Sequence, residues 1–132
     1  KPGKPSTFAI IKNNKYFLGL PGNPVSCFIS TLFLFSEMIN SFYGFELIKF
    51  ETKTLISQSN YKRKNNLTNF LRIKTNNKFH NKFTIFNDQD SSLQKTLALS
   101  DGILVLDPSI KTVKKGQKHR VLIFKNLDLN LI

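Results

Sequence analysis

The residues of this chain most suited to chemistry lie in two short turns near its beginning. The first turn, KPGK at residues 1–4, carries the ammonium groups of Lys1 and Lys4 on either side of a Pro-Gly pair. Pro2 fixes φ, and Gly3 lets the backbone come close to a ligand. Two cations held on such a turn could clamp a small dianion.

The second turn, GLPGNPVS at residues 19–26, leads into a long apolar stretch. Gly22 permits a sharp turn, Asn23 is a favoured N-cap, and Pro24 suits the first helical position. The start of a helix presents N–H groups and a partial positive charge to solvent. We therefore expect a helix-start anion site here, with the hydroxyl of Ser26 as a further donor.

Two β-prone runs lie between these turns and are expected to bring them together. Residues 7–11 (TFAII) and 16–20 (YFLGL) are separated by KNNK, in which Asn13 and Asn14 tolerate the positive φ of a tight hairpin turn. A hairpin would place the end of the second run beside the start of the first. Each turn alone is better explained as ordinary capping or as an exposed turn than as a binding site. Together they predict one site for a small oxyanion.

A helix is expected from residue 24 to Gly44, which is placed to act as its C-cap. Projection at 100° per residue puts Phe33 within the polar stripe, so we expect another domain or subunit to cover it. Apolar side chains fill most of the remaining surface. The polar stripe itself consists of Ser26, Ser30, Ser36, Glu37, Asn40 and Ser41.

From about residue 47 the pattern changes to short β-rich segments with polar turns between them. The segments are LIKFETKTLIS, NLTNFLRIKT, KFTIF, GILVLD and HRVLIF, and SSLQKTLALSDG adds a helical turn. Such a series predicts an all-β, barrel-like or sandwich domain at residues 47–132. Residues 1–46 predict an α/β fragment, which looks incomplete because one hairpin cannot cover both sides of an apolar helix.

Composition limits the remaining function classes. The formal charge of +12 favours polyanionic partners, although the bias toward Lys, Asn, Ile and Phe explains the charge equally well. The single cysteine, Cys27, excludes an internal disulfide and is expected to be a buried, inert thiol. His80 and His119 stand far apart and are not expected to bind metal. A cytoplasmic location is expected, with no export leader and no membrane span, because polar residues interrupt the apolar stretch.

Two alternative functions follow from the residues of the β domain. A basic nucleic-acid-binding barrel is suggested by cations interleaved with aromatic residues, but strand alternation would point the two types to opposite faces. A dimerisation or scaffold domain is the other alternative. The interleaved residues are Lys62, Arg63, Lys64, Arg72, Lys74, Lys78, His80 and Lys82 with Tyr61, Phe70, Phe79 and Phe83.

The order and spacing of these motifs resemble one family, the molybdopterin molybdenumtransferases, which include MoeA and the gephyrin E domain. The run KPGKP…F…GLPGNPVS before an apolar helix carries the resemblance, and SSLQKTLALSDGILVLDPSIKTVKKGQKHRVLIF is similar to the family's C-terminal segment. Residues 50–90 match only in general character. Cys27 and the pair Asp107-Pro108 depart from the family pattern.

The resemblance implies the C-terminal part of an enzyme that inserts molybdenum from molybdate into adenylylated molybdopterin, with Mg²⁺, in molybdenum cofactor biosynthesis. Lys1 and Lys4 then match the basic residues assigned to molybdate and phosphate, and Gly22, Asn23, Pro24 and Ser26 match the second anion-binding loop. The implied partners are a small anionic pterin-phosphate ligand, an upstream α/β domain and a second copy in a full-length homodimer, with neither membrane nor nucleic acid.

The same resemblance implies that the family's acidic residues, which hold the cation, lie upstream of the Lys-Pro-Gly-Lys turn. We expect no catalytic residue and no metal ligand in this chain, and no transferase activity from it alone. The aspartates of the β domain are expected in turns, held by local hydrogen bonds. They are Asp88, Asp90, Asp101 and Asp107.

Overall fold

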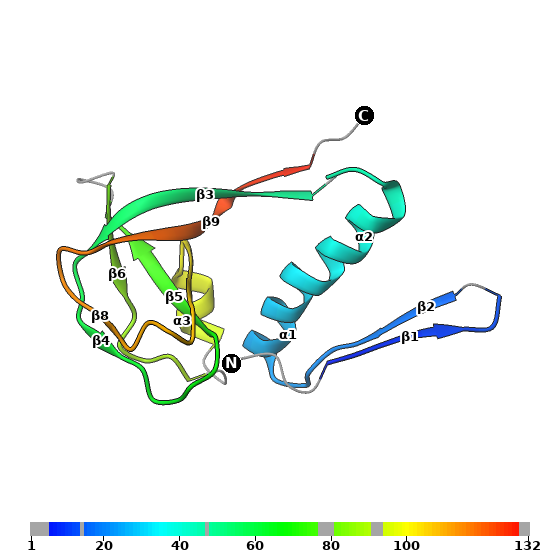
Figure 1. Cartoon of the computed structure of the whole chain (residues 1–132), viewed down its shortest axis with the longest axis horizontal. Coiled ribbons are helices and arrows are strands. Elements are labelled where there is room, and N and C mark those ends of the chain that lie inside the picture. The colour runs from blue at the N-terminus through cyan, green and yellow to red at the C-terminus, as the bar shows by residue number, and fades with distance from the viewer. Residues whose placement is uncertain (1–5, 14, 47, 77–80, 91–93, 130–132) are drawn as a thin grey trace.

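The computed structural model describes residues 6–13, 15–46, 48–76, 81–90 and 94–129, with the backbone alone at residues 48 and 125–129. A hairpin lies on one side of a long helix, and a β-barrel lies on its other side (Figure 1). This confirms the expected fold class, an α/β fragment followed by a barrel.

The hairpin consists of β1 (Thr7–Ile11) and β2 (Lys15–Gly19). The strands are antiparallel, in a register that runs from Thr7 opposite Gly19 to Ile11 opposite Lys15. Asn13 adopts a φ of 67° in the connecting turn, a conformation that Asn tolerates better than most residues. The predicted hairpin is therefore confirmed, and it brings the start of β1 beside the end of β2.

The long helix contains a segment that the sequence pattern did not predict. α1 (Pro24–Ser30) passes into a π-helical turn, η1 (Thr31–Phe35), and then into α2 (Ser36–Tyr43). Hydroxyl groups bond back to the helix on both sides of η1: Thr31 Oγ1 donates to the Cys27 carbonyl over 2.9 Å. Gly44, with a φ of 70°, ends the helix as predicted.

The π-helical turn corrects the expected polar stripe. Each extra residue in a turn rotates the following residues by about 100° relative to an α-helix. A uniform projection consequently misplaces the side chains beyond residue 31. Beyond the turn, Ser36, expected on a polar face, is buried, whereas large apolar side chains are exposed: Leu34, Phe35, Phe42 and Tyr43. Ser26 and Ser30, which precede the turn, are buried as well.

The barrel closes in the order β3-β6-β5-β7-β9, with β3 and β6 parallel and the other pairs antiparallel. All five predicted strands are present, as is the predicted helical turn, α3 (Gln94–Leu99). Two short strands that were not predicted, β4 (Tyr61–Lys62) and β8 (Thr112–Val113), pair with each other. The barrel strands are β3 (Ile48–Ser57), β5 (Asn69–Thr75), β6 (Lys82–Ile85), β7 (Gly102–Leu106) and β9 (Lys118–Leu129).

The barrel interior is closely packed. Its side chains come from alternate positions of the strands, as a closed sheet requires. Gly102 lies where β7 approaches β9 most tightly, because a Cβ atom there would stand 2.1 Å from the Leu122 carbonyl oxygen. The buried core residues are Leu55, Leu71, Ile73, Phe83, Ile85, Leu104, Leu106, Val113, Val121 and Ile123.

A second apolar cluster joins the helix to the outside of the barrel. Val25, Ile29 and Leu32 of the helix pack with Ile103 and Leu122 of the barrel. Aromatic contacts extend this cluster, because Phe28 meets Phe124 edge to face, and Phe33 lies between Phe50 and Phe70 with ring centroids 5.8 and 5.1 Å away. The barrel of the same chain therefore provides the cover expected for Phe33.

Among the described residues, one helix, Pro24–Tyr43, is apolar and long enough to cross a membrane by composition and length. A core helix of a soluble protein meets the same criterion. Here the helix packs between the hairpin and the barrel (Figure 1).

Candidate functional site

The predicted helix-start turn has the geometry of an asparagine cap. Asn23 is extended, with φ −76° and ψ 127°, and Pro24 occupies the first helical position. The Asn23 side-chain oxygen accepts hydrogen bonds from the backbone N–H groups of Val25 and Ser26, each over 3.2 Å. The N–H of Cys27 donates to the Asn23 carbonyl over 2.8 Å.

This cap changes which groups could bind an anion. The first-turn N–H groups that were expected to face a ligand are engaged by Asn23, and Pro24 has none to offer. The remaining donors of the predicted set are side chains: the Asn23 amide nitrogen, at the other end of the carboxamide, and the Ser26 hydroxyl. Ser26 is buried in the first turn, only 5% exposed.

Gly22 does not use a positive φ in this turn, so the turn itself does not require glycine. A Cβ atom at this position would meet no atom within 4 Å. The absence of a side chain instead leaves space beside Asn23 on the exposed side of the turn.

A contact links the described residues that follow the first turn to the helix that begins at the second. Lys1 and Lys4 lie outside the described residues, so their predicted roles stay predictions. Ser6, the first described residue after that turn, donates from its hydroxyl to the Ser30 hydroxyl over 3.2 Å. Ser30 lies four residues after Ser26, about 6 Å further along the helix axis. This contact places Ser6 beside the first part of the helix. Sequence reasoning missed this contact, because a single serine pair far apart in sequence carries no pattern.

Comparison with known proteins gives a consistent result in sequence and fold. No family model matches the sequence. The molybdenum cofactor synthesis protein cinnamon of Drosophila melanogaster is 70% identical over 30 residues, which are 23% of this chain and 5% of cinnamon. Two crystal structures of the molybdopterin biosynthesis protein MoeA from Pyrococcus horikoshii superpose with TM-scores of 0.74 and 0.73, at 22% and 16% identity.

These structures match nearly the whole chain, 93% and 94% of it. A molybdenum cofactor biosynthesis protein from Pyrococcus furiosus matches at a TM-score of 0.73 and 14% identity. The chain resembles the C-terminal portion of the MoeA family. It covers only 29%, 30% and 42% of the lengths of the three solved chains.

The acidic residues of the MoeA-like barrel are engaged in structural hydrogen bonds. Asp88 accepts from the Asp90 N–H, and Asp107 accepts from the Ser109 N–H and hydroxyl, as expected for turn aspartates. Asp107 is exposed, and its pKa is lowered mainly by the Ser109 hydrogen bonds. Within the described residues, no group of three or more His, Cys, Asp or Glu side chains could hold a metal ion.

Asp101 departs from the expected local turn bonding, because its carboxylate bonds to a neighbouring strand. It accepts from the Thr75 N–H (2.9 Å), the Thr75 hydroxyl (2.8 Å) and Lys74 Nζ (3.1 Å). Burial alone raises the pKa of this carboxyl, but the Thr75 and Lys74 interactions outweigh burial and hold the pKa below its ordinary value. Asp101 is therefore a buried anion that secures the entry to β7.

Two arginines of the basic stretch that was considered for nucleic-acid binding form hydrogen bonds within the barrel. Arg72 is only 2% exposed and donates to the carbonyls of Asp88 and Asp90. Burial lowers the pKa of this guanidinium, which the nearby Asp88 and Asp90 carboxylates partly oppose. Arg63 donates to the carbonyls of Leu67, Leu106 and Pro108 and so ties together one end of the barrel.

The aromatic residues of that stretch are also used internally. Phe83 is in the barrel core, and Phe70 packs against Phe33 of the helix. The internal roles of the two arginines were not predicted, because most of the carbonyls that they bind are distant along the chain. Lys78, Phe79 and His80 lie outside the described residues.

The remaining reactive side chains have structural surroundings. Cys27 is a free, half-buried thiol in the first turn of the helix. His119 is half-buried with its ring edge-to-face against Phe83, and burial lowers its pKa. Its Nε2 atom is buried without a hydrogen-bond partner, so the neutral ring is favoured.

Proposed function

We propose that this chain is the C-terminal part of a molybdopterin molybdenumtransferase, which inserts molybdenum from molybdate into adenylylated molybdopterin. The observation that carries the proposal is the 70% identity over 30 residues with a molybdenum cofactor synthesis protein. The match of over nine-tenths of the chain to MoeA structures supports it through the fold.

In this proposal the two turns bind the anionic parts of the substrates. Lys1 and Lys4 supply positive charge to molybdate or to a phosphate, while the Asn23 amide nitrogen and the Ser26 hydroxyl supply oriented donors. The open side of Gly22 gives the anion room to approach. Pro24 and the Asn23 cap fix the turn, so the donors need little reorganisation when the anion binds.

The cation of the reaction is proposed to bind elsewhere in a complete enzyme. Mg²⁺ prefers carboxylate and water oxygens in octahedral geometry. The described aspartates do not fit such a site, since Asp88, Asp101 and Asp107 each accept hydrogen bonds within the barrel. We therefore propose that the chain alone is inactive. An upstream α/β domain and a second copy of the full-length protein are the proposed partners, in the cytoplasm.

The proposal is tested by binding and turnover with a hybrid protein. The part of P. horikoshii MoeA outside the matched region is joined to residues 1–132, and AMP release from adenylylated molybdopterin with molybdate is measured. We expect release from the hybrid and none from the 132-residue chain alone. Release by the chain alone would contradict its proposed inactivity, and a folded hybrid that neither binds nor turns over the substrate would contradict the function.

Ser26→Ala provides the residue-level test, with Ser30→Ala as its matched control one turn later. Loss of one hydrogen bond to a charged ligand costs about 1.5 to 3 kcal/mol. Ser26→Ala should therefore weaken molybdate binding to the hybrid roughly tenfold to a hundredfold, and Ser30→Ala should leave it within about twofold. Equal effects of the two substitutions on molybdate binding would contradict the proposed role of Ser26 as a donor to the anion.

A further inference from the structure

The short ribbon formed by β4 and β8 has one face fixed to the barrel and one face turned to solvent. In the pairing of the two strands, Tyr61 lies opposite Val113, and Lys62 lies opposite Thr112. Val113 is buried in the barrel core, and Tyr61 packs against that core. Because side chains alternate along a strand, Lys62 and Thr112 point to the outer face.

Hydrogen bonds extend the ribbon at both ends and bring further lysines onto it. The Arg63 N–H donates to the Lys111 carbonyl over 3.1 Å. At the other end, the Lys115 N–H donates to the Asn60 side-chain oxygen over 2.9 Å. Several exposed lysines are therefore held close together on one part of the surface. We call them the lysine cluster, and they are Lys62, Lys64, Lys111, Lys114 and Lys115.

The positive charges of the lysine cluster are not neutralised by the chain itself. Within the described residues, none of these lysines forms an ion pair with a carboxylate. The Asp107 carboxylate interacts with Arg63 of the ribbon and accepts two hydrogen bonds from Ser109, so it is already used in its own turn. Like charges gathered on one surface repel one another and destabilise the fold. Binding of a polyanion would remove that repulsion.

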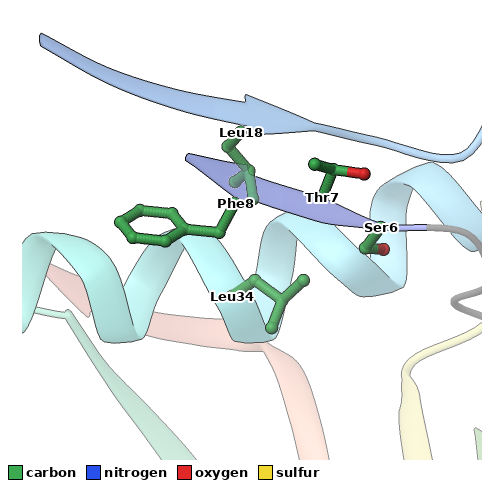
Figure 2. A pocket seen from close by; sticks show the side chains of 5 residues that line it. All are labelled: Ser6, Thr7, Phe8, Leu18 and Leu34. Carbon is green, nitrogen blue, oxygen red and sulfur yellow. The ribbon is translucent and has the colours of Figure 1, made fainter. Parts of the chain in front are cut away.

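The side chains of this surface favour carboxylates over nucleic-acid bases or lipid. Single-stranded nucleic acid is bound by stacking bases on aromatic rings, and peripheral helices enter membranes with large apolar side chains. In the described residues, the exposed aromatic side chains lie in the region 6–46 and not on the barrel. Phe8, for example, lines a cavity of about 420 Å³ between hairpin and helix (Figure 2). Lysine supplies a mobile point charge rather than the planar fork with which arginine recognises phosphate.

We propose that the lysine cluster docks an acidic segment of a partner protein, in which several Asp or Glu side chains follow one another along the chain. A single exposed lysine-carboxylate contact contributes little, so the segment must engage several lysines at once. β4 and β8 lie on the side of the barrel away from α1 and α2 (Figure 1). The surface is therefore separate from the candidate anion site, and the proposal does not depend on the proposed function.

Fluorescence anisotropy of a labelled polyglutamate peptide, titrated with the 132-residue chain, tests the proposal. At about 0.15 M salt, screening confines charge interactions to about 8 Å. We expect saturable binding that weakens at least about tenfold when Lys62→Glu and Lys114→Glu are introduced together. The matched control is Lys12→Glu with Lys15→Glu, which changes the net charge equally on the exposed hairpin. It should leave binding within about twofold.

Three results would overturn the proposal. One is the absence of binding to the wild-type chain, and another is equal weakening by the two pairs of substitutions, which would assign binding to net charge. The third is tighter binding of poly(U) RNA or phosphatidylserine vesicles than of polyglutamate, lost with the same two lysines, which would make the surface a site for nucleic acid or membrane. Lys62→Arg with Lys114→Arg keeps both charges and should retain binding, and an unchanged denaturation midpoint confirms that each variant folds.

Discussion

The barrel and the hairpin-helix region differ in how completely they bury their apolar side chains. Ile73, Phe83, Ile103 and Leu106 of the barrel are 0% exposed. Ile10 of the hairpin is 66% exposed, and Tyr43 of the helix is 59% exposed. Closure of the sheet accounts for the full burial of the barrel core, because it pairs each strand on both sides and encloses one face of the sheet.

This difference shows where folding information lies in the chain. The barrel obtains its strands, core and turn hydrogen bonds from residues 48–129 themselves. The hairpin and helix obtain one covered side from the barrel, through Phe28 and Phe33, and leave the other exposed. A large exposed apolar surface on a soluble domain usually marks an interface. The two regions should therefore respond differently to the same kind of substitution.

The largest expected difference concerns glycine. Gly102→Ala places a Cβ atom against the Leu122 carbonyl oxygen, so β7 and β9 must separate. We expect a loss of about 3 kcal/mol or more in the free energy of unfolding. Gly22→Ala, where the Cβ atom meets no neighbour, should change it by less than about 0.5 kcal/mol. Urea denaturation measures both, and similar losses would refute the close approach of the two strands.

Substitutions at two isoleucines, one in each region, compare the barrel and the hairpin directly. Ile73→Ala removes a fully buried side chain from the barrel core and should cost about 2 to 5 kcal/mol. Ile10→Ala removes one that is mostly exposed and should cost less than about 0.5 kcal/mol in the chain alone. Urea denaturation would show the contrast as a lower midpoint for Ile73→Ala than for Ile10→Ala, with an unchanged m value. A comparable cost at Ile10 would mean that the hairpin is already complete.

The buried anion of the barrel should give an intermediate effect. Asp101→Asn weakens the bonds to Lys74 and Thr75 and should cost about 1 to 3 kcal/mol at pH 7. The pKa of Asp101 is lowered in the fold, so its stabilisation is present above about pH 4 and is lost as pH falls through that lowered pKa. Urea denaturation should show that the difference in the free energy of unfolding between wild type and variant is smaller at pH 3 than at pH 7. A gap independent of pH would exclude the charged interaction.

His119 should produce the smallest effect. Its pKa is lowered by burial, so the unfolded chain binds a proton at a higher pH than the folded chain does. Stability should then fall as pH decreases below about 6.5. His119→Phe keeps an aromatic ring against Phe83 and should remove this part of the pH dependence. Thermal denaturation at pH 7.5 and 5.0 would measure this pH dependence. An equal change in denaturation temperature for wild type and variant would mean that another group causes it.

Local patterns predicted most of the fold. The Asn13 turn, the Asn23 cap, Pro24 at the first helical position and the Gly44 cap depend on neighbouring residues, and all are confirmed. The five barrel strands were also predicted, because turn residues separate them. These features need no information from distant parts of the chain.

Non-local contacts were beyond the sequence pattern. The π-helical turn shifts the helix faces that follow it, so Ser36 is buried where a polar face was expected. Arg72 is buried because carbonyls of the Asp88–Asp90 loop reach it. The site was predicted only in outline: the cap engages the first-turn N–H groups, and the roles of Lys1 and Lys4 remain predictions.

Native-state hydrogen exchange of the 132-residue chain tests the contrast between the regions most directly. We expect the core strands β5 and β7 to exchange only through global unfolding, and the β1 and β2 amides to exchange by local opening at rates at least a hundredfold faster. Equal protection of the hairpin and the barrel would contradict the account, because it would mean that the hairpin needs no further partner.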